Sequence, residues 1–314
     1  MSTDPVHVAV AVIIRNDRIL LAKRPLHLHQ GGLWEFPGGK LELHESVQDA
    51  LVRELAEELD IEATHYTPLI RIQHDYGDKH VLLDVWCVTA FEGEPQGREA
   101  QEIRWVAPAQ LNEFEFPAAN RPILQALTLP HECLITPEPL DSSTFLRSVE
   151  ASLHAGVRLL QFRAKTLSTE EYLQLAQQIE RLCRHYGAIL LLNTSLENYQ
   201  QTTADGLHLS AQQLYKLSAR PVAADLLLSA ACHNRQEVEQ ANRLGCDLIF
   251  ISPVAKTLTH PEISPIGWQG FYQLTELACM PVYALGGMEY SDVETAQQYG
   301  GQGIAAIRAL WQEA

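Results

Sequence analysis

Residues 39–61 read GKLELHESVQDALVRELAEELDI, a stretch that combines five glutamates with a regular pattern of apolar side chains. The apolar side chains recur at every fourth position, at Val47, Leu51, Leu55 and Leu59. This spacing predicts a helix over residues 45–59 with one apolar stripe that faces a core. Glu54, Glu57 and Glu58 stand at i, i+3 and i+4, so they share a different face of that helix.

The crowding of these three glutamates needs an explanation, because like charges at this spacing repel one another. A solvated acidic face is one interpretation. Arg53, four residues before Glu57, is placed to orient one carboxylate. The stretch also follows a WEFPGGK loop, whose glycines let the backbone approach a ligand closely. A hard cation held by carboxylate oxygens, with phosphate filling its other positions, explains both features.

Six residues repeat the spacing of a known motif: Gly39, Glu45, Arg53, Glu54, Glu57 and Glu58. This spacing resembles the Nudix box. The family pattern has glycine where this chain has Asp60, and aspartate tolerates a left-handed backbone better than most residues. The resemblance extends to the MutT branch over about residues 5–130, through WEFPGGK, DKH, EGEPQGREAQEIRW and FPAANRPI. It implies an α+β Nudix fold, with a mixed sheet between helices.

MutT-like Nudix enzymes convert 8-oxo-dGTP to its monophosphate and pyrophosphate, using Mg²⁺ and a water that attacks the β-phosphorus. The resemblance implies a ligand set for Mg²⁺, with Mn²⁺ as the alternative: the Gly39 carbonyl, Glu54, Glu57, Glu58 and Glu99. Glu54 and Glu99 are the two candidates for the general base. Arg53 and Glu45 are counted with the catalytic residues: Glu45 is expected to support the geometry of the loop and helix, and Arg53 to orient a carboxylate. Carboxylates alone repel a triphosphate, so they have to act through metal ions.

Asn120, in FPAANRP, matches the MutT asparagine whose amide reads the purine edge. An amide offers both a donor and an acceptor, which suits the edge of an oxidised guanine. The alternative for Asn120 is an N-cap of the helix that follows it. The resemblance also implies four nucleotide contacts: Arg24 and Lys79 near the phosphate, and Phe36 and Tyr76 around the base. Each has a simpler alternative as a surface base or a core aromatic residue.

The order of the predicted strands and helices changes near residue 130. Before that point strands and helices mix without a repeat: strands at residues 6–14, 18–23, 79–90 and 103–106, and short helices at 108–114 and 121–127. Beyond it, eight predicted strands alternate with helical sequence: 133–136, 159–163, 189–193, 206–209, 226–230, 248–252, 282–285 and 303–307. This alternation predicts a (β/α)8 TIM barrel, with a doubly wound sheet as the alternative. We therefore predict two domains, residues 1–130 and 131–314.

Polar and glycine residues lie at the predicted carboxyl ends of the barrel strands, where barrel active sites are built. Gln161, Arg163 and Lys165 close one strand, and Gly286 and Gly287 follow the seventh. The loops after strands seven and eight are the usual phosphate site of such barrels, and a tight turn is the alternative for the glycines. Residues 132–311 resemble thiamine-phosphate synthase and its relative TenI, through ADGLHLS, CHNRQEVEQANRLGCDLIFISPV, MPVYALGGM and GIAAIRAL.

The departures from the synthase pattern affect its metal site. The synthase has Asn-Asp after the third strand, where this chain has Asn193 and Thr194, and its second magnesium aspartate falls at Gln213. The loop threonines remain as Thr257 and Thr259, but the following lysine is His260. Without two acidic ligands, a magnesium-dependent pyrophosphate reaction is not favoured.

TenI-like tautomerases use a histidine as acid and base, and His233 matches that position. A structural histidine is the simpler alternative. The ligand implied for the barrel is a thiazole phosphate or thiamine phosphate. Two alternatives stand for the barrel: a thiazole tautomerase-like enzyme, or a regulatory domain that binds the ligand without turnover.

The charge balance limits the partners of the chain. Its 39 acidic and 23 basic residues give a formal net charge of −16, which disfavours binding to a nucleic acid polymer. A free nucleotide is still compatible, because a divalent cation can bridge two anions. The six cysteines include no C-x-x-C pair and predict reduced thiols. With no signal peptide or membrane span in the pattern, we expect a cytoplasmic protein.

The sequence thus predicts a Mg²⁺-dependent nucleoside triphosphate pyrophosphohydrolase that acts on 8-oxo-dGTP. Its role would be to remove oxidised nucleotides from the nucleotide pool and so to avoid mutations. The alternative is a Nudix hydrolase of other diphosphates, such as a thiamine-related one, joined to a thiamine-pathway barrel.

Overall fold

The structure is a computed structural model that describes residues 5–26, 30–75, 77, 80–257 and 263–314. The chain forms two compact units, Met1–Thr128 and Leu129–Ala314, and each is described by itself. Four residues of the sequence analysis, Tyr76, Lys79, Thr259 and His260, lie outside the described residues.

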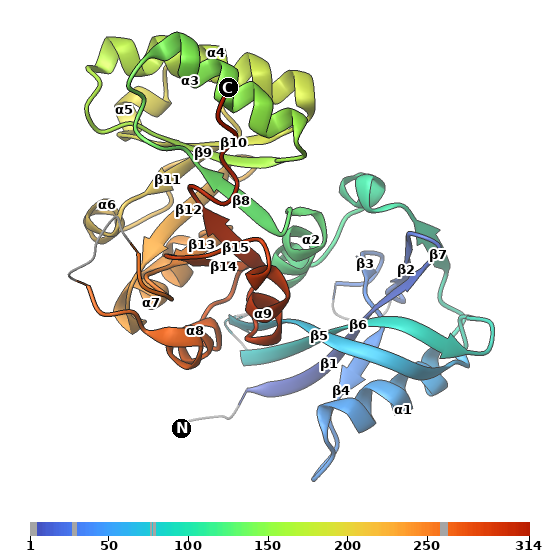
Figure 1. Ribbon diagram of the computed structural model, residues 1–314. Coiled ribbons are helices and arrows are strands. Elements are labelled where there is room, and N and C mark those ends of the chain that lie inside the picture. The colour runs from blue at the N-terminus through green and yellow to red at the C-terminus, as the bar shows by residue number, and fades with distance from the viewer. Residues whose placement is uncertain (1–4, 27–29, 76, 78–79, 258–262) are drawn as a thin grey trace. The chain divides into compact units, whose positions relative to one another are not determined.

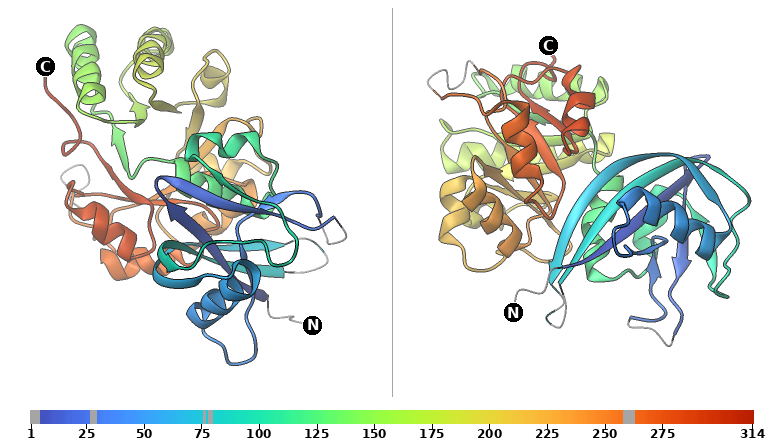
Figure 2. Two further views of the ribbon diagram at one scale, coloured as in Figure 1. Left: turned by 90° about the vertical axis from the view of Figure 1, so that its right-hand side faces the viewer. Right: turned by 90° about the horizontal axis from the view of Figure 1, so that it is seen from below.

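The first unit is built on a mixed sheet. Its strands are β1 (Val6–Arg15), β2 (Arg18–Lys23), β3 (Trp34–Glu35), β4 (Gly38–Lys40), β5 (Glu62–Asp75), β6 (His80–Glu92) and β7 (Ile103–Val106). The main order is β3-β2-β1-β6-β5, with β4 paired to β1 and β7 paired to β2. β1 and β6 run parallel, whereas β5 runs antiparallel to β6. The sheet curves around α1 in Figure 2.

Helices cover both faces of this sheet: α1 (Val47–Leu59), α2 (Arg121–Thr128) and the 3-10 helices η1 (Pro108–Glu113) and η2 (Ala118–Asn120). Side chains of β1 alternate between the two faces, as a strand requires. Ala9 and Ala11 pack with Leu55 of α1, whereas Val10 and Val12 belong to the core that includes Ile123 of α2. The expected Nudix architecture, a mixed sheet between helices, is confirmed.

Three details of the first unit differ from the sequence prediction. The WEFPGGK stretch, expected to be a loop, contains the short strands β3 and β4, whose pairing with β2 and β1 depends on distant segments. α1 begins at Val47 and not at residue 45, because Ser46 acts as its N-cap and accepts a hydrogen bond from Asp49 N at 3.1 Å. The long strand β5 was not predicted. Its pairing with β6 contains register shifts around His65 and Pro68, and such bulges interrupt the alternation that identifies a strand.

The second unit is a closed barrel of eight parallel strands in the order β10-β11-β12-β13-β14-β15-β8-β9. The strands are β8 (Glu132–Ile135), β9 (Leu159–Arg163), β10 (Ile189–Asn193), β11 (Gly206–Leu209), β12 (Leu227–Cys232), β13 (Leu248–Ile251), β14 (Val282–Leu285) and β15 (Gly303–Ala306). The barrel prediction is confirmed, and the doubly wound alternative is wrong because β8 pairs with both β9 and β15.

Helices surround this barrel in Figure 1: α3 (Ser142–His154), α4 (Thr169–Tyr186), α5 (Leu196–Tyr199), α6 (Ala211–Lys216), α7 (Arg235–Leu244), α8 (Gly267–Thr275) and α9 (Asp292–Gln298). The barrel interior is filled by apolar side chains such as Leu159, Phe250 and Tyr283. A second core lies between strands and helices and includes Phe162, Ile179 and Leu192. The two cores fix the strand ends that carry the polar residues.

All six cysteines lie in the described ranges and are free thiols, four of them buried. Among the helices of the described residues, none has the length and apolar character needed to cross a bilayer.

Candidate active site

The strand β4 brings its backbone against the glutamate face of α1. Leu51, Leu55 and Leu59 are fully buried, so α1 is fixed against the sheet beside β4. An added Cβ at Gly39 would lie 2.1 Å from the carboxyl carbon of Glu54. The chain therefore needs glycine here for Glu54 to reach the backbone.

Arg53 is the centre of an ion-pair network on α1. Its Nε donates to Glu45 Oε1 at 2.8 Å, and its Nη1 donates to Glu54 Oε1 at 2.8 Å and to Glu57 Oε2 at 3.3 Å. Its Nη2 donates to Lys40 O at 3.1 Å. The hydrogen bond from Arg53 is the main reason that the pKa of Glu45 falls to about 2. Arg53 thus offsets much of the repulsion on this face.

Glu58 lies at the centre of a carboxylate cluster. Its Oε2 accepts a hydrogen bond from Gly38 N at 3.2 Å. Burial raises the pKa of Glu58 to about 8, with further contributions from the negative charges of Glu35, Glu54 and Glu99. Four carboxylates from α1, β3 and the loop before β7 therefore lie within electrostatic reach of one another.

Glu35 is a member of this cluster that the sequence analysis did not select. It pairs with Arg24, and burial raises the pKa of its carboxyl group. The residue lies inside the quoted WEFPGGK stretch, three positions before Gly38. The signal that could have identified it is an acidic residue in a short strand otherwise made of apolar residues.

The expected metal ligands are all oxygen donors: the Gly39 carbonyl and the carboxylates of Glu54, Glu57, Glu58 and Glu99. Such a set of ligands fits a hard divalent cation. Within the described part of the chain, no three acidic, histidine or cysteine side chains are already arranged as metal ligands. Arg53 holds Glu54 and Glu57 in their present positions. The fit rests on Glu58, whose pKa is raised first by burial and further by the negative charges of Glu35, Glu54 and Glu99. A bound cation would neutralise those charges.

The three predicted nucleotide contacts that can be placed have different surroundings. Arg24 forms an ion pair with Glu35. Phe36 is only 4% exposed and stacks on Phe116 with ring centroids 5.6 Å apart, so it belongs mainly to the core. Asn120 is 8% exposed, and its side-chain amide has no hydrogen-bond partner among the described residues. Asn120 ends η2 and directly precedes Arg121, the first residue of α2.

The barrel places a polar cluster at the carboxyl ends of β9 to β12. Asn193 Nδ2 donates to Gln161 Oε1 at 3.3 Å. His208 Nδ1 lies 3.0 Å from Ser229 Oγ, and burial, with the nearby charge of Arg163, lowers the pKa of His208 to about 3. This neutral histidine was missed by the sequence analysis, although it lies in the quoted stretch ADGLHLS.

The positions that correspond to the synthase metal ligands are occupied by a neutral hydrogen-bond network. Gln213 Nε2 donates to Thr194 O at 2.8 Å, and its Oε1 accepts from Ser210 N at 2.8 Å to cap α6. Thr194 Oγ1 accepts from Asn198 Nδ2 at 3.1 Å. A magnesium ion needs anionic oxygen ligands, so these residues do not fit one.

His233 follows β12 and is held by the first turn of α7. Its Nδ1 lies 2.9 Å from Glu237 Oε2, which also accepts from His233 N at 2.6 Å. Glu237 is largely buried, whereas the His233 side chain is 44% exposed. Because Nδ1 contacts Glu237, Nε2 is the ring nitrogen that is left to exchange a proton with a ligand.

The other barrel residues are accounted for by local packing. Lys165 is exposed, and its backbone N donates to Glu138 Oε1 at 2.7 Å. Gly286 and Gly287 have φ values of 100° and 70°, and a Cβ at Gly287 would lie 2.4 Å from Lys256 O. A tight turn packed on the neighbouring loop therefore explains both glycines.

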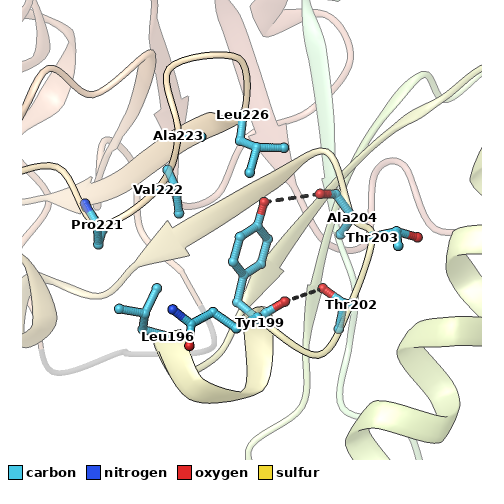
Figure 3. A pocket seen from close by; sticks show the side chains of 10 residues that line it. Leu196, Tyr199, Thr202, Thr203, Ala204, Pro221, Val222, Ala223 and Leu226 are labelled. Carbon is cyan, nitrogen blue, oxygen red and sulfur yellow. Dashed lines mark hydrogen bonds between the residues drawn. The ribbon is translucent and has the colours of Figure 1, made fainter.

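A hollow of about 450 Å³ lies on the second unit, away from these residues (Figure 3). It is bounded by α5 and by the segments that precede β11 and β12, at the amino ends of the strands. The Tyr199 hydroxyl donates to Ala204 O at 3.1 Å along its wall. This is the face of a barrel that usually serves stability, so we do not assign the hollow to the active site.

Comparisons with known proteins match the two units separately. Residues 9–126 match the model of the NUDIX domain family, and residues 132–310 match that of the thiamine monophosphate synthase family. The 8-oxo-dGTP diphosphatase of Escherichia coli is 37% identical over 121 residues, which are 38% of this chain and 94% of that protein. A solved MutT structure, from a study of Aliivibrio salmonicida and Vibrio cholerae, is 39% identical and covers 40% of this chain and 97% of its own, with a TM-score of 0.36.

The second unit has relatives of two lengths. A putative thiamine-phosphate synthase 2 of Aquifex aeolicus is 33% identical over 58% of this chain and 97% of that protein. The thiamine-phosphate synthase of Prochlorococcus marinus (strain MIT 9313) is also 33% identical, but the chain spans only 52% of its length. The chain therefore belongs to the Nudix family through its first unit and to the thiamine monophosphate synthase family through its second.

Proposed function

We propose that the Nudix domain, residues 1–130, is a Mg²⁺-dependent nucleoside triphosphate pyrophosphohydrolase that acts on 8-oxo-dGTP in the cytoplasm. The observation that carries this proposal is the cluster formed by Glu35, Glu54, Glu58 and Glu99 near Gly38, the first residue of β4. Such a cluster repels a triphosphate unless cations are bound to it. Its oxygen donors suit Mg²⁺, and Mn²⁺ is the alternative ion.

The residues that would hold the cation are the Gly39 carbonyl, Glu54, Glu57, Glu58 and Glu99. A bound divalent ion would neutralise phosphate charge and lower the pKa of an attacking water. Glu54 and Glu99 remain the candidates to accept the proton of that water. Arg53 and Glu45 hold the glutamate face in position through their ion pair.

We assign base selection to Asn120, a mostly buried residue whose amide offers both a donor and an acceptor. An amide that must be paired in a closed site discriminates strongly against a base with the wrong edge. Arg24, which pairs with Glu35, is the proposed phosphate contact. Phe36 supports the base site from the core, and Tyr76 and Lys79 remain proposed contacts.

The decisive experiment measures pyrophosphate release by the full-length protein with Mg²⁺, from 8-oxo-dGTP and from dGTP at low concentration. We expect a strong preference for the oxidised nucleotide and its loss in Asn120→Ala. Glu54→Gln is the control for chemistry at the cluster and should abolish both activities. Comparable rates with the two nucleotides would overturn the substrate assignment and direct the search to other diphosphates, such as thiamine-related ones.

A second candidate function belongs to the barrel, residues 131–314. The pair of His233 and Glu237 favours a proton-transfer reaction, because the carboxylate fixes the imidazole and leaves Nε2 available. The substrate class is a thiazole phosphate, with phosphate near Arg163, Lys165, Gly286 and Gly287. The neutral network at Thr194 and Gln213 opposes a metal-dependent synthase reaction.

Isomerisation of a thiazole phosphate by the full-length protein tests this second function. His233→Ala should abolish it and leave triphosphate hydrolysis unchanged. Binding of thiamine phosphate without turnover, accompanied by a change in the hydrolysis rate, would instead identify the barrel as a regulatory domain. An unchanged hydrolysis rate at saturating ligand would exclude that regulatory role.

A further inference from the structure

The loop that carries Glu99 is bound to the carboxyl end of α1. Gln96 N donates to Leu59 O at 2.9 Å, and Arg98 N donates to Glu58 O at 2.9 Å. Carbonyls in the last turn of a helix lack partners within the helix, so this loop satisfies them. The last turn of α1, which the structure describes in full, has no basic residue. Arg98 supplies that positive charge through an ion pair with Asp60 at 2.7 Å.

Within this loop the side chain of Gln101 connects two glutamates that are far apart in the sequence. Its Oε1 accepts a hydrogen bond from Glu99 N at 2.7 Å. Its Nε2 donates to Glu58 O at 3.1 Å. One carboxamide therefore holds the backbone of Glu99 against the backbone of Glu58, and both of its polar ends are used.

The backbone between Glu99 and Gln101 needs this restraint. Ala100 has a φ of 60°, in the left-handed region that is unfavourable for a residue with a Cβ. Gly97 packs so closely that a Cβ there would lie 2.2 Å from Gln101 O. A strained loop with an exposed carboxylate would not hold that carboxylate beside Glu58 without fixed contacts.

We propose that Gln101 is a positioning residue for the pyrophosphohydrolase reaction, which sets Glu99 beside the glutamates of α1. The inference rests on the proposed function of the Nudix domain. Gln101 does not touch the reacting atoms in this assignment, and it acts through Glu99. Partners behind a metal ligand of this kind typically change affinity for the metal or activity by about 10- to 100-fold when they are removed.

The test compares Gln101→Met with the wild-type protein and with Gln110→Met. Methionine keeps the length of the side chain and removes both hydrogen bonds. Gln110 is the matched control, because it makes a comparable bond to Ala107 N at 3.3 Å on an exposed 3-10 helix. We expect Gln101→Met to lower kcat/KM by about tenfold or more and to raise the Mg²⁺ concentration needed for half-maximal rate. Gln110→Met should change neither quantity.

The same substitution is repeated in a Glu99→Gln background. If Gln101 acts only through the Glu99 carboxylate, replacing Gln101 should have no effect on the rate once that carboxylate is removed. We expect no additional decrease in rate from Gln101→Met in that background. An equal decrease in both backgrounds, or no decrease in either, would overturn the proposal.

Hydrogen exchange separates this proposal from the proposed function. The Glu99 amide should exchange faster in Gln101→Met than in the wild-type protein and in Gln110→Met. Unchanged exchange would overturn the role of Gln101 whether or not the enzyme is active. Wild-type protein that hydrolyses no triphosphate would overturn the proposed function and with it the catalytic role of this contact, whatever the exchange result.

Discussion

Arg53 and Glu45 form a two-point ion pair, with Nε 2.8 Å from Oε1 and Nη2 2.9 Å from Oε2. Glu45 Oε2 also accepts from Glu42 N at 2.8 Å. The loop before α1 and the glutamate face of α1 are therefore joined at one carboxylate. This planar geometry suits a guanidinium group and not an ammonium group.

The first prediction is that Glu45→Gln lowers the rate of pyrophosphate release by about tenfold, because Arg53 loses the partner that orients it toward Glu54. Arg53→Lys should lower the rate as well, since lysine cannot form the two-point contact. Initial rates with Mg²⁺ measure both effects. The control is Glu94→Gln, which removes an exposed partner of Arg15 at 3.1 Å and should leave the rate unchanged. Equal rates for Glu45→Gln and Glu94→Gln would contradict this view of the pair.

The second prediction contrasts two neighbouring glycines. A Cβ at Gly39 would meet the flexible carboxylate of Glu54 at 2.1 Å, so Gly39→Ala should displace that carboxylate and abolish most of the activity. The fold should tolerate the change, because a flexible side-chain end can move. A Cβ at Gly38 would meet the backbone oxygen of Ala9 at 2.1 Å, at a φ of 143°. Gly38→Ala should therefore lower the melting temperature.

Thermal denaturation and pyrophosphate release separate the two variants. We expect Gly39→Ala to melt close to the wild-type temperature and to be nearly inactive. A large decrease in the melting temperature of Gly39→Ala would show that position 39 serves the fold and not the approach of Glu54.

Much of the barrel could be predicted from the sequence, because buried parallel strands are continuous apolar runs between helices of regular period. The predicted limits of the strands at residues 159–163, 189–193, 206–209 and 282–285 agree with the structure. β5 could not be predicted, since its bulges around Pro68 break the alternation. The periodicity of apolar residues predicts which segments are buried, but it does not predict irregular pairing between strands.

The glutamates of α1 could be predicted because their spacing is local and follows the helix. The contributions of Glu35 and Gln101 could not, because each depends on contacts with a distant segment. Gln101 reaches Glu58 across 43 positions of the chain. His208 could not be selected either, because its neutral state results from burial against Ser229 and from the charge of Arg163.

The third prediction concerns pH and metal removal. In the protein freed of divalent cations, burial raises the pKa of Glu58 from 4.5 to about 8. The folded state then binds more protons than the unfolded chain between these values, so the free energy of unfolding should decrease as pH rises through this interval. Mg²⁺ should remove much of this decrease, because a cation favours the ionised carboxylate.

Denaturant unfolding of the Nudix domain in the full-length protein, followed from pH 5 to pH 8 with EDTA or with Mg²⁺, measures the effect. Glu58→Gln is the control and should lessen the pH dependence in EDTA. Stability that rises with pH in EDTA would contradict the assignment, since it would mean that Glu58 is already ionised in the folded protein.

The fourth prediction concerns the stability of the barrel. Arg220 Nη2 lies 2.6 Å from Asp247 Oδ2, and Asp247 is 2% exposed and also accepts from Leu228 N at 2.7 Å. Arg220→Met leaves this carboxylate buried without its cation, and such a loss typically costs about 3–5 kcal/mol of stability. Arg235→Met is the matched control, because Arg235 and Glu239 form an exposed i,i+4 pair at 3.4 Å.

An exposed pair of this kind typically contributes about 0.3–0.5 kcal/mol, because water screens both charges and the side chains lose freedom when they pair. Chemical denaturation of the barrel, measured on the full-length protein, should therefore separate the two variants by several kcal/mol, with Arg220→Met the less stable. The extra cost should diminish in Arg220→Met/Asp247→Asn, because an amide carries no charge to bury. Equal stability of Arg220→Met and Arg235→Met would mean that water reaches Asp247 when the guanidinium is removed.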